Sequence, residues 1–400
     1  MASSLASFTT HNLADVRDII SAAIADNTRL DVCATGTKKA LGHAGDFDAV
    51  LDVTKMAGVI DYQPEELILT LRAGTPLADV ETLLTNANQM LAFDPPDFGK
   101  LLGGGDAGTI GGVMVANLSG PRRLTVGAAR DFMLGFEAVS GRGELFKSGG
   151  KVVKNVTGYD LSKLICGSFG TLAVVDEITL KTLPRPETSL SLLFPADDMA
   201  QATSMIADIF ATPHEPGSAA ILPHNIAKDA RIDMNAPMII VVRLEGIAVS
   251  VNDRAMHLLN ANATGEKLDH GKSKKLWQKI RDVDLLAGMP ADVWKISCPP
   301  SIAAGFLDKL RQQVAFDFYS DWAGGLIWLS GVSDKNFGGA VRSALGQDGF
   351  AMLMRDVGDS KAHVSPFQPL ATSMFELHKR VKAAFDPKSV LNFGRMHDGI

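Results

Sequence analysis

Small residues and hydroxyl groups are concentrated in turns of the front half of the chain, where they could bind a phosphate group. The first such turn, ATGTKK, covers residues 34–39 and follows a short strand pattern at 30–34. A turn of this kind can direct several backbone N–H groups at one anion, and a diphosphate would fit. Taken alone, the segment is more typical of an ordinary turn with solvated lysines.

The run TIGGVMVANLSGPRR combines positions without side chains and two cations. Gly111 and Gly112 leave room for a flat or phosphorylated group to lie against the backbone. Gly120 and the proline after it turn the chain and present Arg122 and Arg123, whose guanidinium groups can neutralise a diphosphate. A buried glycine- and alanine-rich helix with surface arginines would have the same sequence. The run alone therefore does not decide between a phosphate site and a packed helix.

Two more glycine-bounded turns follow, in KNVTGYDL and GSFGTL. The first precedes a short helix and the second, residues 167–172, precedes a strand. Tyr159 is equally typical of a half-buried packing aromatic, and Asp160 of a helix N-cap. A different run, residues 103–108, satisfies GxGxxG, but the two prolines of the preceding DPPDFGKLL exclude the strand that a Rossmann turn requires. We interpret it as a flexible loop.

The elements that must position these turns fall on both sides of Pro184-Arg185-Pro186, the best candidate for a domain boundary. Before this boundary the patterns predict a helix at 12–25, strands at 30–34, 49–53 and 67–73, and a helix with Thr75 as N-cap and Pro76 at N1. Only scraps of regular structure are predicted between 94 and 131. A hairpin at 132–147 and a strand at 171–180 follow. After the boundary the patterns predict strands at 189–194, 218–222, 237–244, 292–297, 325–330 and 350–354, and helices near 197–211, 250–262, 273–287, 301–313, 335–346 and 368–385. We therefore expect an α+β fold with a domain at 1–186, an α+β cap on a mostly antiparallel sheet at 187–385, and a segment at 386–400 that returns to the first domain.

Composition excludes several classes of protein. The 400 residues carry a formal net charge of −6 without a block of basic residues, which argues against nucleic-acid binding. No apolar run approaches the ~18 residues of a membrane span, and the first residues lack the pattern of a secretory signal. The three cysteines are far apart and form no CxxC, so we expect a cytoplasmic protein that holds no metal and no iron–sulfur cluster.

Together these turns resemble a known family. The runs GTIGGVMVANLSGPRRLTVGAARDF and KVVKNVTGYDLSKLICGSFGTLAVVDEITLKTLPRP, and the closing DPKSVLNFGR, are similar to the FAD-binding (PCMH) domain of the vanillyl-alcohol oxidase type and to the E subunits of bacterial glycolate oxidase. The similarity is strong over roughly 65–186 and weak in the cap. It implies a domain of two α+β subdomains that hold FAD between them, followed by the α+β cap.

The resemblance also implies a set of residues around FAD. It assigns the diphosphate loop to residues 35–38, the ribityl and isoalloxazine side to the 95–122 region, the next turn to 127–131, the adenine side to Ile178, and a last contact to the closing element. The full set is Thr35, Gly36, Thr37, Lys38, Pro95, Gly111, Gly112, Asn117, Gly120, Arg122, Gly127, Arg130, Asp131, Gly158, Tyr159, Asp160, Gly170, Ile178 and Arg395.

Two departures from the family shape the functional expectation. The diphosphate loop lacks a histidine, so we expect FAD to be bound non-covalently. The cap lacks the histidine-rich motif with which the larger flavin subunit of the family handles the hydroxy acid, and we name no catalytic base. Arg355 and His363 are candidate substrate contacts by position alone, and surface residues explain them better.

The resemblance implies oxidation of a small 2-hydroxy acid such as glycolate, with a larger FAD-binding subunit and an iron–sulfur subunit as partners. On one hypothesis, the larger partner oxidises glycolate and this chain stabilises the complex or relays electrons. The alternatives are a self-sufficient dehydrogenase of D-lactate or another hydroxy acid, and a non-catalytic scaffold that holds the flavin. The sequence leaves open whether the complex associates peripherally with the inner face of the membrane.

Overall fold

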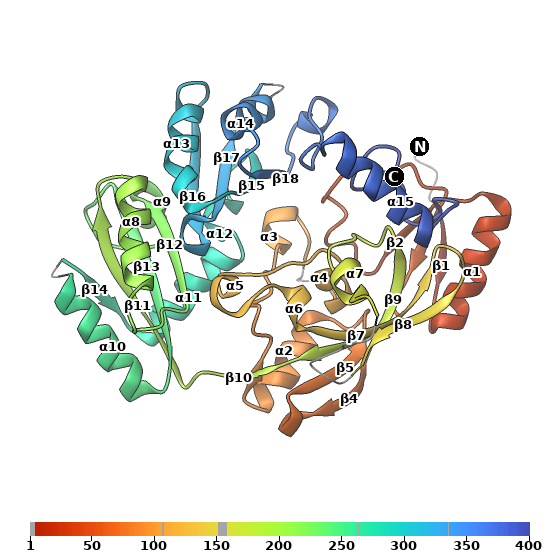
Figure 1. Ribbon diagram of the computed structural model, residues 1–400, viewed down its shortest axis with the longest axis horizontal. Helices are drawn as coiled ribbons and strands as arrows, with labels where there is room; N and C mark the ends of the chain where they lie inside the picture. The colour runs from red at the N-terminus through yellow and green to blue at the C-terminus, as the bar shows by residue number, and fades with distance from the viewer. Residues whose placement is uncertain (1–4, 106–107, 151–157, 263, 335) are drawn as a thin grey trace.

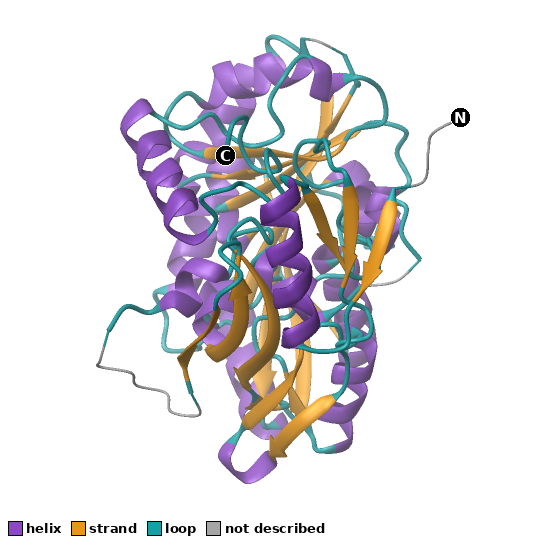
Figure 2. Ribbon diagram, turned by 90° about the vertical axis from the view of Figure 1, so that its right-hand side faces the viewer, coloured by secondary structure: helices purple, strands orange, loops and turns teal. Residues whose placement is uncertain are grey.

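The computed structural model describes residues 5–105, 108–150, 158–262, 264–334 and 336–400. The molecule has two halves that lie side by side (Figure 1). One half carries a three-stranded and a five-stranded sheet, and the other carries an eight-stranded sheet. In Figure 2 the first half faces the viewer, and its strands lie beside helices. No helix among the described residues is long and apolar enough to cross a membrane.

A small parallel sheet opens the chain. β1 (Ala6–Thr9), β3 (Ala49–Asp52) and β2 (Leu30–Cys33) pair in the order β1-β3-β2. α1 (Leu13–Asp26) begins after Asn12, whose side-chain oxygen accepts hydrogen bonds from the amides of the next turn. The apolar stripe of the helix packs on the sheet in one core cluster.

An antiparallel sheet forms the rest of the first half. Its order is β4 (Val59–Gln63), β5 (Ile68–Arg72), β9 (Ala173–Lys181), β7 (Met133–Ser140) and β8 (Leu145–Gly149). β9, which follows the GSFGTL turn, therefore lies in the centre of the sheet, next to β5. A two-stranded ribbon, β6 (Gln89–Met90) with β10 (Leu183–Pro184), completes this half.

Short helices occupy the region where we expected only scraps of regular structure, and this expectation is confirmed. They are α3 (Gly99–Leu102), α4 (Ile110–Val115), α5 (Arg123–Val126) and α6 (Ala129–Phe132), each four to six residues long. α7 (Leu161–Ile165) comes after residues 151–157, which the structure does not describe. A helix, α3, precedes the glycine run at 103–108 in place of a strand, which agrees with rejecting a Rossmann turn.

The second half is an antiparallel sheet with helices on both faces, so the predicted α+β fold is confirmed. In spatial order its strands are β14 (Glu266–Leu268), β11 (Thr188–Ala196), β13 (Met238–Gly246), β12 (Ser218–Pro223), β16 (Phe316–Asp321), β17 (Leu326–Gly331), β15 (Asp292–Ser297) and β18 (Phe350–Arg355). The helices α8 (Met199–Phe210), α10 (Ala248–Ala261), α13 (Pro300–Arg311) and α14 (Phe337–Leu345) share a core cluster with one face of this sheet. α9 (His224–Asp229), α11 (His270–Arg281) and α12 (Asp284–Ala287) join the core of the other face.

The largest core cluster crosses from one half of the molecule to the other. It contains Leu71 and Phe93 of the first half together with Val241 and Trp328 of the eight-stranded sheet. The two halves therefore share one continuous apolar interior, and the division at 186 and at 385 stays a prediction.

Buried ion pairs cross the same interface. The guanidinium group of Arg122 donates two hydrogen bonds to the carboxylate of Glu245, at 2.8 and 2.7 Å. Arg243 lies 3.5 Å from both Glu245 and Asp94, and Arg281 lies 3.6 Å from Asp94. Burial alone would raise the pKa of Asp94, but these three arginines outweigh it and hold the pKa below its ordinary value.

A closing segment, residues 386–400, lies against the first half after α15 (Thr372–Phe385). Lys382 is buried and its ammonium group donates to the carboxylate of Asp386 and to the carbonyls of Thr171 and Leu391, at 2.7 to 2.8 Å. The Leu30 amide donates to a carbonyl of the closing segment, which thereby extends the edge of β2.

Three expectations about individual elements were wrong. Thr75 does not cap α2 (Leu77–Asn86), which begins after Pro76, because its hydroxyl group bonds to the backbone of Gly58 and Arg72. The helix predicted at 273–287 is two helices, because Val283 has a φ of 60°. The sequence analysis missed β1, β4, β6, β10, β14 and β16, each of which is six residues long or shorter.

We predict that Lys382→Met destabilises the protein, because it leaves the fully buried carboxylate of Asp386 without its cation. Removing one partner of a buried pair costs about 3–5 kcal/mol of unfolding free energy. Urea unfolding monitored by circular dichroism measures the change. Lys379→Met on the exposed side of the same helix is the control and should change stability by less than about 0.5 kcal/mol. Equal effects of the two substitutions would contradict the role of the pair.

Candidate functional site

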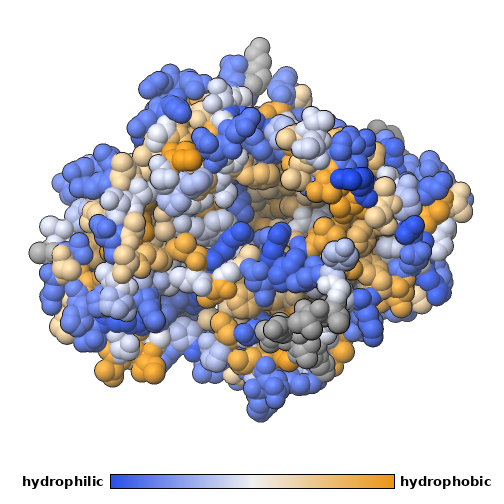
Figure 3. Space-filling view, viewed as in Figure 1, coloured by the Kyte–Doolittle hydropathy of each residue, from blue (hydrophilic) through white to orange (hydrophobic). Residues whose placement is uncertain are grey.

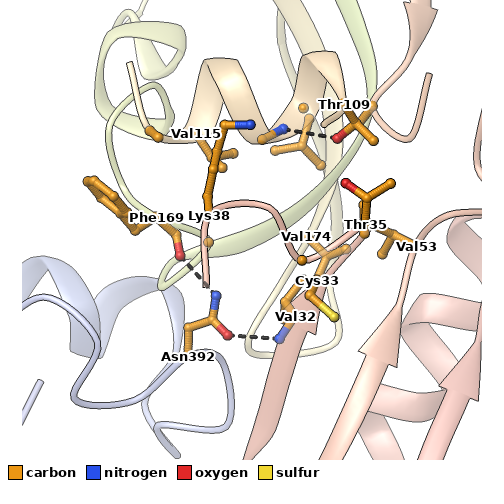
Figure 4. Close-up of a pocket in the computed structure, with 18 of the residues that line it drawn as sticks. Val32, Cys33, Thr35, Lys38, Val53, Thr109, Val115, Phe169, Val174 and Asn392 are labelled. Carbon is orange, nitrogen blue, oxygen red and sulfur yellow. Dashed lines mark hydrogen bonds between the residues drawn. The ribbon is translucent and has the colours of Figure 1, made fainter. Parts of the chain in front are cut away.

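One cavity lies where β2, α4, the start of β9 and the closing segment meet (Figure 4). Its walls come from six stretches that are far apart in the sequence. The lining residues are Val32, Cys33, Ala34, Thr35, Gly36, Thr37, Lys38, Lys39, Val53, Ala73, Thr109, Gly111, Gly112, Val115, Ala116, Phe169, Gly170, Ala173, Val174, Val175, Asn392 and Arg395.

The turn after β2 presents backbone amides to this cavity. Among the described residues, no hydrogen bond takes the amides of Thr35, Gly36 or Thr37. Gly36 has a φ of 76°, a conformation that favours glycine. Successive amides in such a turn form a concave site for an anion. The assignment of a diphosphate to this turn, which the family resemblance implies, stays a prediction.

α4 forms the opposite wall. The hydroxyl oxygen of Thr109 caps the helix by accepting from the Gly112 amide at 3.3 Å. Gly111 lies against Ala73, where a Cβ would overlap the Ala73 backbone, so glycine is needed for the helix to approach β5. A Cβ on Gly112 would point at the Lys38 side chain, which extends toward α4 in Figure 4.

The other end of the cavity is apolar. Val32 and Val53 come from the small parallel sheet, and Val174 and Val175 come from β9, with Ala73 beside them. Such a slot suits a flat ring, while the turn at 35–38 suits a charged group. The cavity thus offers one polar and one apolar region to the same ligand.

The closing segment fastens two of these walls together. The Asn392 side-chain oxygen accepts from the Val32 amide at 2.8 Å, and its amide group donates to the Phe169 carbonyl at 2.9 Å. Arg395 donates to the Lys38 carbonyl at 3.1 Å and lies 3.6 Å from Asp31. Gly170 leaves room for Asn392, because a Cβ there would lie within 2.8 Å of its amide nitrogen.

Charged and titratable side chains lie around these hydrogen bonds of the closing segment. Lys39 pairs with Asp31 at 2.7 Å. Burial, assisted by the charge of Asp31, raises the pKa of the Cys33 thiol, so the thiol stays protonated at neutral pH. Burial and the neighbouring imidazole of His378 lower the pKa of His397 to about 4, so this ring in the closing segment is neutral.

Eight of the predicted residues line the cavity together, in the diphosphate turn, on α4, at the start of β9 and in the closing segment. They are Thr35, Gly36, Thr37, Lys38, Gly111, Gly112, Gly170 and Arg395. The sequence reading missed Asn392, which stands in the closing element that it quoted, and Val174 and Val175, which follow the predicted Gly170. The valines stand in the apolar run that opens the strand predicted at 171–180, and this run was the signal that could have found them.

The remaining predicted residues lie outside the lining of this cavity. Arg122 is bound to Glu245 and therefore does not face the diphosphate turn. Tyr159 is 90% exposed, and Ile178 is fully buried between β5 and β7. Asp160 caps α7, as its alternative interpretation expected. Part of the KNVTGYDL run, residues 154–157, lies outside the described residues.

Most of the others build the turn that supports α4. Asn117, with a φ of 50°, accepts from the Arg130 amide, and Arg130 donates to the Cys166 carbonyl. Asp131 accepts from the amide at the start of α6, and Gly127 ends α5 with a φ of 99°. Pro95, Gly120 and Gly158 complete the predicted set: Pro95 is buried, Gly120 packs against Asp94, and Gly158 has a φ of 86°. Their place around a ligand remains a proposal.

Comparison with known proteins identifies the ligand of this fold. Residues 5–149 match the model of an FAD-binding domain family. The chain is 35% identical over 388 residues to the glycolate oxidase subunit GlcE of Escherichia coli strain K12, and the match covers 94% of this chain and 95% of that protein.

Other relatives share less of the chain or only its fold. The glycolate oxidase subunit GlcD of Bacillus subtilis strain 168 is 33% identical over 173 residues, which are 43% of this chain and 35% of that protein. The structure of p-cresol methylhydroxylase with substrate bound superposes with a TM-score of 0.68 at 14% identity, and the match covers 98% of this chain and 88% of that one. The chain is thus a flavoprotein of known architecture, and it belongs to the FAD-binding oxidoreductase family of the glycolate oxidase subunit GlcE.

Proposed function

We propose that this chain is the FAD-holding subunit of a complex that oxidises glycolate, or a related small 2-hydroxy acid, to its 2-oxo acid. The observation that supports this proposal most is the cavity, in which a turn with unpaired amides and an apolar slot face each other across a glycine-lined wall. The similarity to GlcE, a glycolate oxidase subunit, extends over nearly the whole chain and supports the choice of substrate.

The residues of the cavity fit FAD in a definite orientation. The amides of residues 35–37 and the Lys38 cation would hold the diphosphate, and the slot formed by Val32, Val53 and Val174 would take the adenine. When bound, FAD supplies a ring that accepts a hydride from the carbinol carbon. The remaining predicted residues, from Pro95 to Tyr159, would then follow the cofactor toward its flavin end.

Two features favour an oxidising complex over an enzyme that acts alone. Three of the arginines between the two halves, Arg122, Arg243 and Arg281, each have a carboxylate from this chain as partner. The cap carries no histidine-rich motif of the kind that the larger flavin subunit is expected to use on the hydroxy acid. A larger flavin subunit would therefore supply the base that removes the hydroxyl proton.

An iron–sulfur subunit would receive the electrons. Cys166 and Cys298 are buried and lie apart from Cys33, and the described residues contain no group of ligands that could hold a metal. Electrons that reach the flavin of this chain must therefore leave through another protein.

The complex, purified from its native source, tests the proposal against this chain alone. Both should show flavin absorption, but only the complex should reduce a dye rapidly with glycolate. Robust turnover of glycolate or D-lactate by the isolated chain would show a self-sufficient dehydrogenase, and a colourless chain that takes up no FAD would show a scaffold without flavin.

We predict that acid denaturation releases all of the flavin into solution. The lining of the cavity holds no histidine among the described residues, and the Cys33 thiol is protonated. Absorbance of the supernatant after acid precipitation gives the released fraction. Flavin that stays in the precipitated protein would contradict non-covalent binding.

We predict that Asn392→Gly weakens FAD binding at least tenfold, because both hydrogen bonds that join β2 to the Phe169 carbonyl are lost. Glycine tolerates the φ of 42° at this position, so the backbone is not strained. Asn392→Asp keeps the acceptor for Val32 and should have a smaller effect. Quenching of flavin fluorescence measures the affinity, and the exposed Asn260→Gly is the control. An unchanged affinity in the glycine variant would show that the fastening is not needed.

A further inference from the structure

Two cations between the halves differ from all the arginines described above. The side chains of Arg123, at the start of α5, and Lys295, on β15, make no hydrogen bond or ion pair with the described residues. Their charged groups face an indole ring instead: the Arg123 guanidinium lies 4.6 Å and the Lys295 ammonium 5.4 Å from the centre of the Trp322 ring. Lys295 also lies 5.9 Å from the Trp328 ring.

Trp322 holds this arrangement at the junction of the two halves. Its indole N–H donates to the Gly120 carbonyl at 3.0 Å, and its amide donates to Asp321. Trp322 and Ala323 have φ values of 49° and 56°, so two consecutive residues occupy the left-handed region. Strain of this kind persists only where the surroundings enforce it, and it is common at binding sites.

Each cation has a carboxylate of the chain nearby, Asp131 for Arg123 and Asp321 for Lys295, but no ion pair joins them among the described residues. Burial and the repulsion from Arg123 lower the pKa of Lys295 to about 8, and the nearby Asp321 opposes this only in part. Asp321 is itself buried, which raises its pKa to about 7. A partly buried pair of like charges is costly unless an anion joins it. Figure 3 shows that this face of the molecule is hollowed over α3 and α5, with hydrophilic residues along the rim.

We propose that Arg123 and Lys295 bind the carboxylate of a small organic acid, the class to which glycolate and glyoxylate belong. Guanidinium and ammonium groups donate charge-assisted hydrogen bonds to a carboxylate. The diphosphate of FAD is not the anion, because neither residue lines the cavity that carries the unpaired amides. The inference rests on the proposed function and adds that this chain, and not only its partner, binds the acid.

Isothermal titration calorimetry of the FAD-loaded full chain with glycolate, oxalate and inorganic phosphate tests the site. Oxalate cannot be oxidised as a hydroxy acid, so it reports binding alone. We expect saturable binding of oxalate and glycolate, at least tenfold weaker in Arg123→Met and in Lys295→Met, with partial recovery in Lys295→Arg. The methionine side chains keep much of the packing against Trp322. Lys274→Met, at an exposed lysine on α11, is the matched control and should bind as the wild type does.

Three results would overturn the site. They are no saturable binding by the wild type, unchanged binding in both methionine variants, and phosphate binding as tight as that of oxalate. The FAD content of every variant is measured by absorbance in the same samples. Loss of flavin from the wild type would refute the proposed function instead, while the titration still reports on the carboxylate site.

Discussion

The cofactor cavity depends on one set of contacts, those that fasten the closing segment to β2 and to the turn before β9. Both walls present backbone N–H and C=O groups that need hydrogen-bond partners. The closing segment, residues 386–400, supplies these partners. Asn392 bridges the two walls, and Lys382 ties the helix before it to the Thr171 carbonyl. Because buried hydrogen-bonding groups are costly when unpaired, the walls are held at a defined separation. A cradle of amides binds a diphosphate only if that separation is preserved.

The interface between the two halves imposes a second constraint, because buried ion pairs and a shared apolar core meet there. Arg122, Glu245, Arg243 and Asp94 form a connected network, in which Arg122 and Asp94 of the first half have their ion-pair partners in the second half. Breaking such a network costs more than the net stability that forming it contributes, so it specifies how the halves meet. Arg123, the neighbour of Arg122, projects toward Trp322 in place of this network. Adjacent arginines in one sequence motif thus have different surroundings.

The sequence predicted the fold class, and eight of the residues that it singled out line one cavity, because both depend on local patterns. Apolar periodicity located most helices and strands, and the glycines of the 35–38 turn and of α4 could be recognised without partners. What it could not predict depends on contacts across the chain. Arg122 resembles a phosphate ligand until Glu245, 123 residues later, is placed beside it. Asn392 could not be assigned a bond to Val32, because 360 residues separate them.

The place of the closing segment in the sequence also determines when the cavity can form during synthesis of the chain. The ribosome makes residues 386–400 after the front half, so the front half leaves the exit tunnel before one wall of its cavity is made. Until then β2 has an open edge at Leu30 and Val32, where the segment later pairs. The cavity can therefore close only once this segment has been made, and a chain without residues 386–400 would keep its sheets while lacking one wall of the cavity.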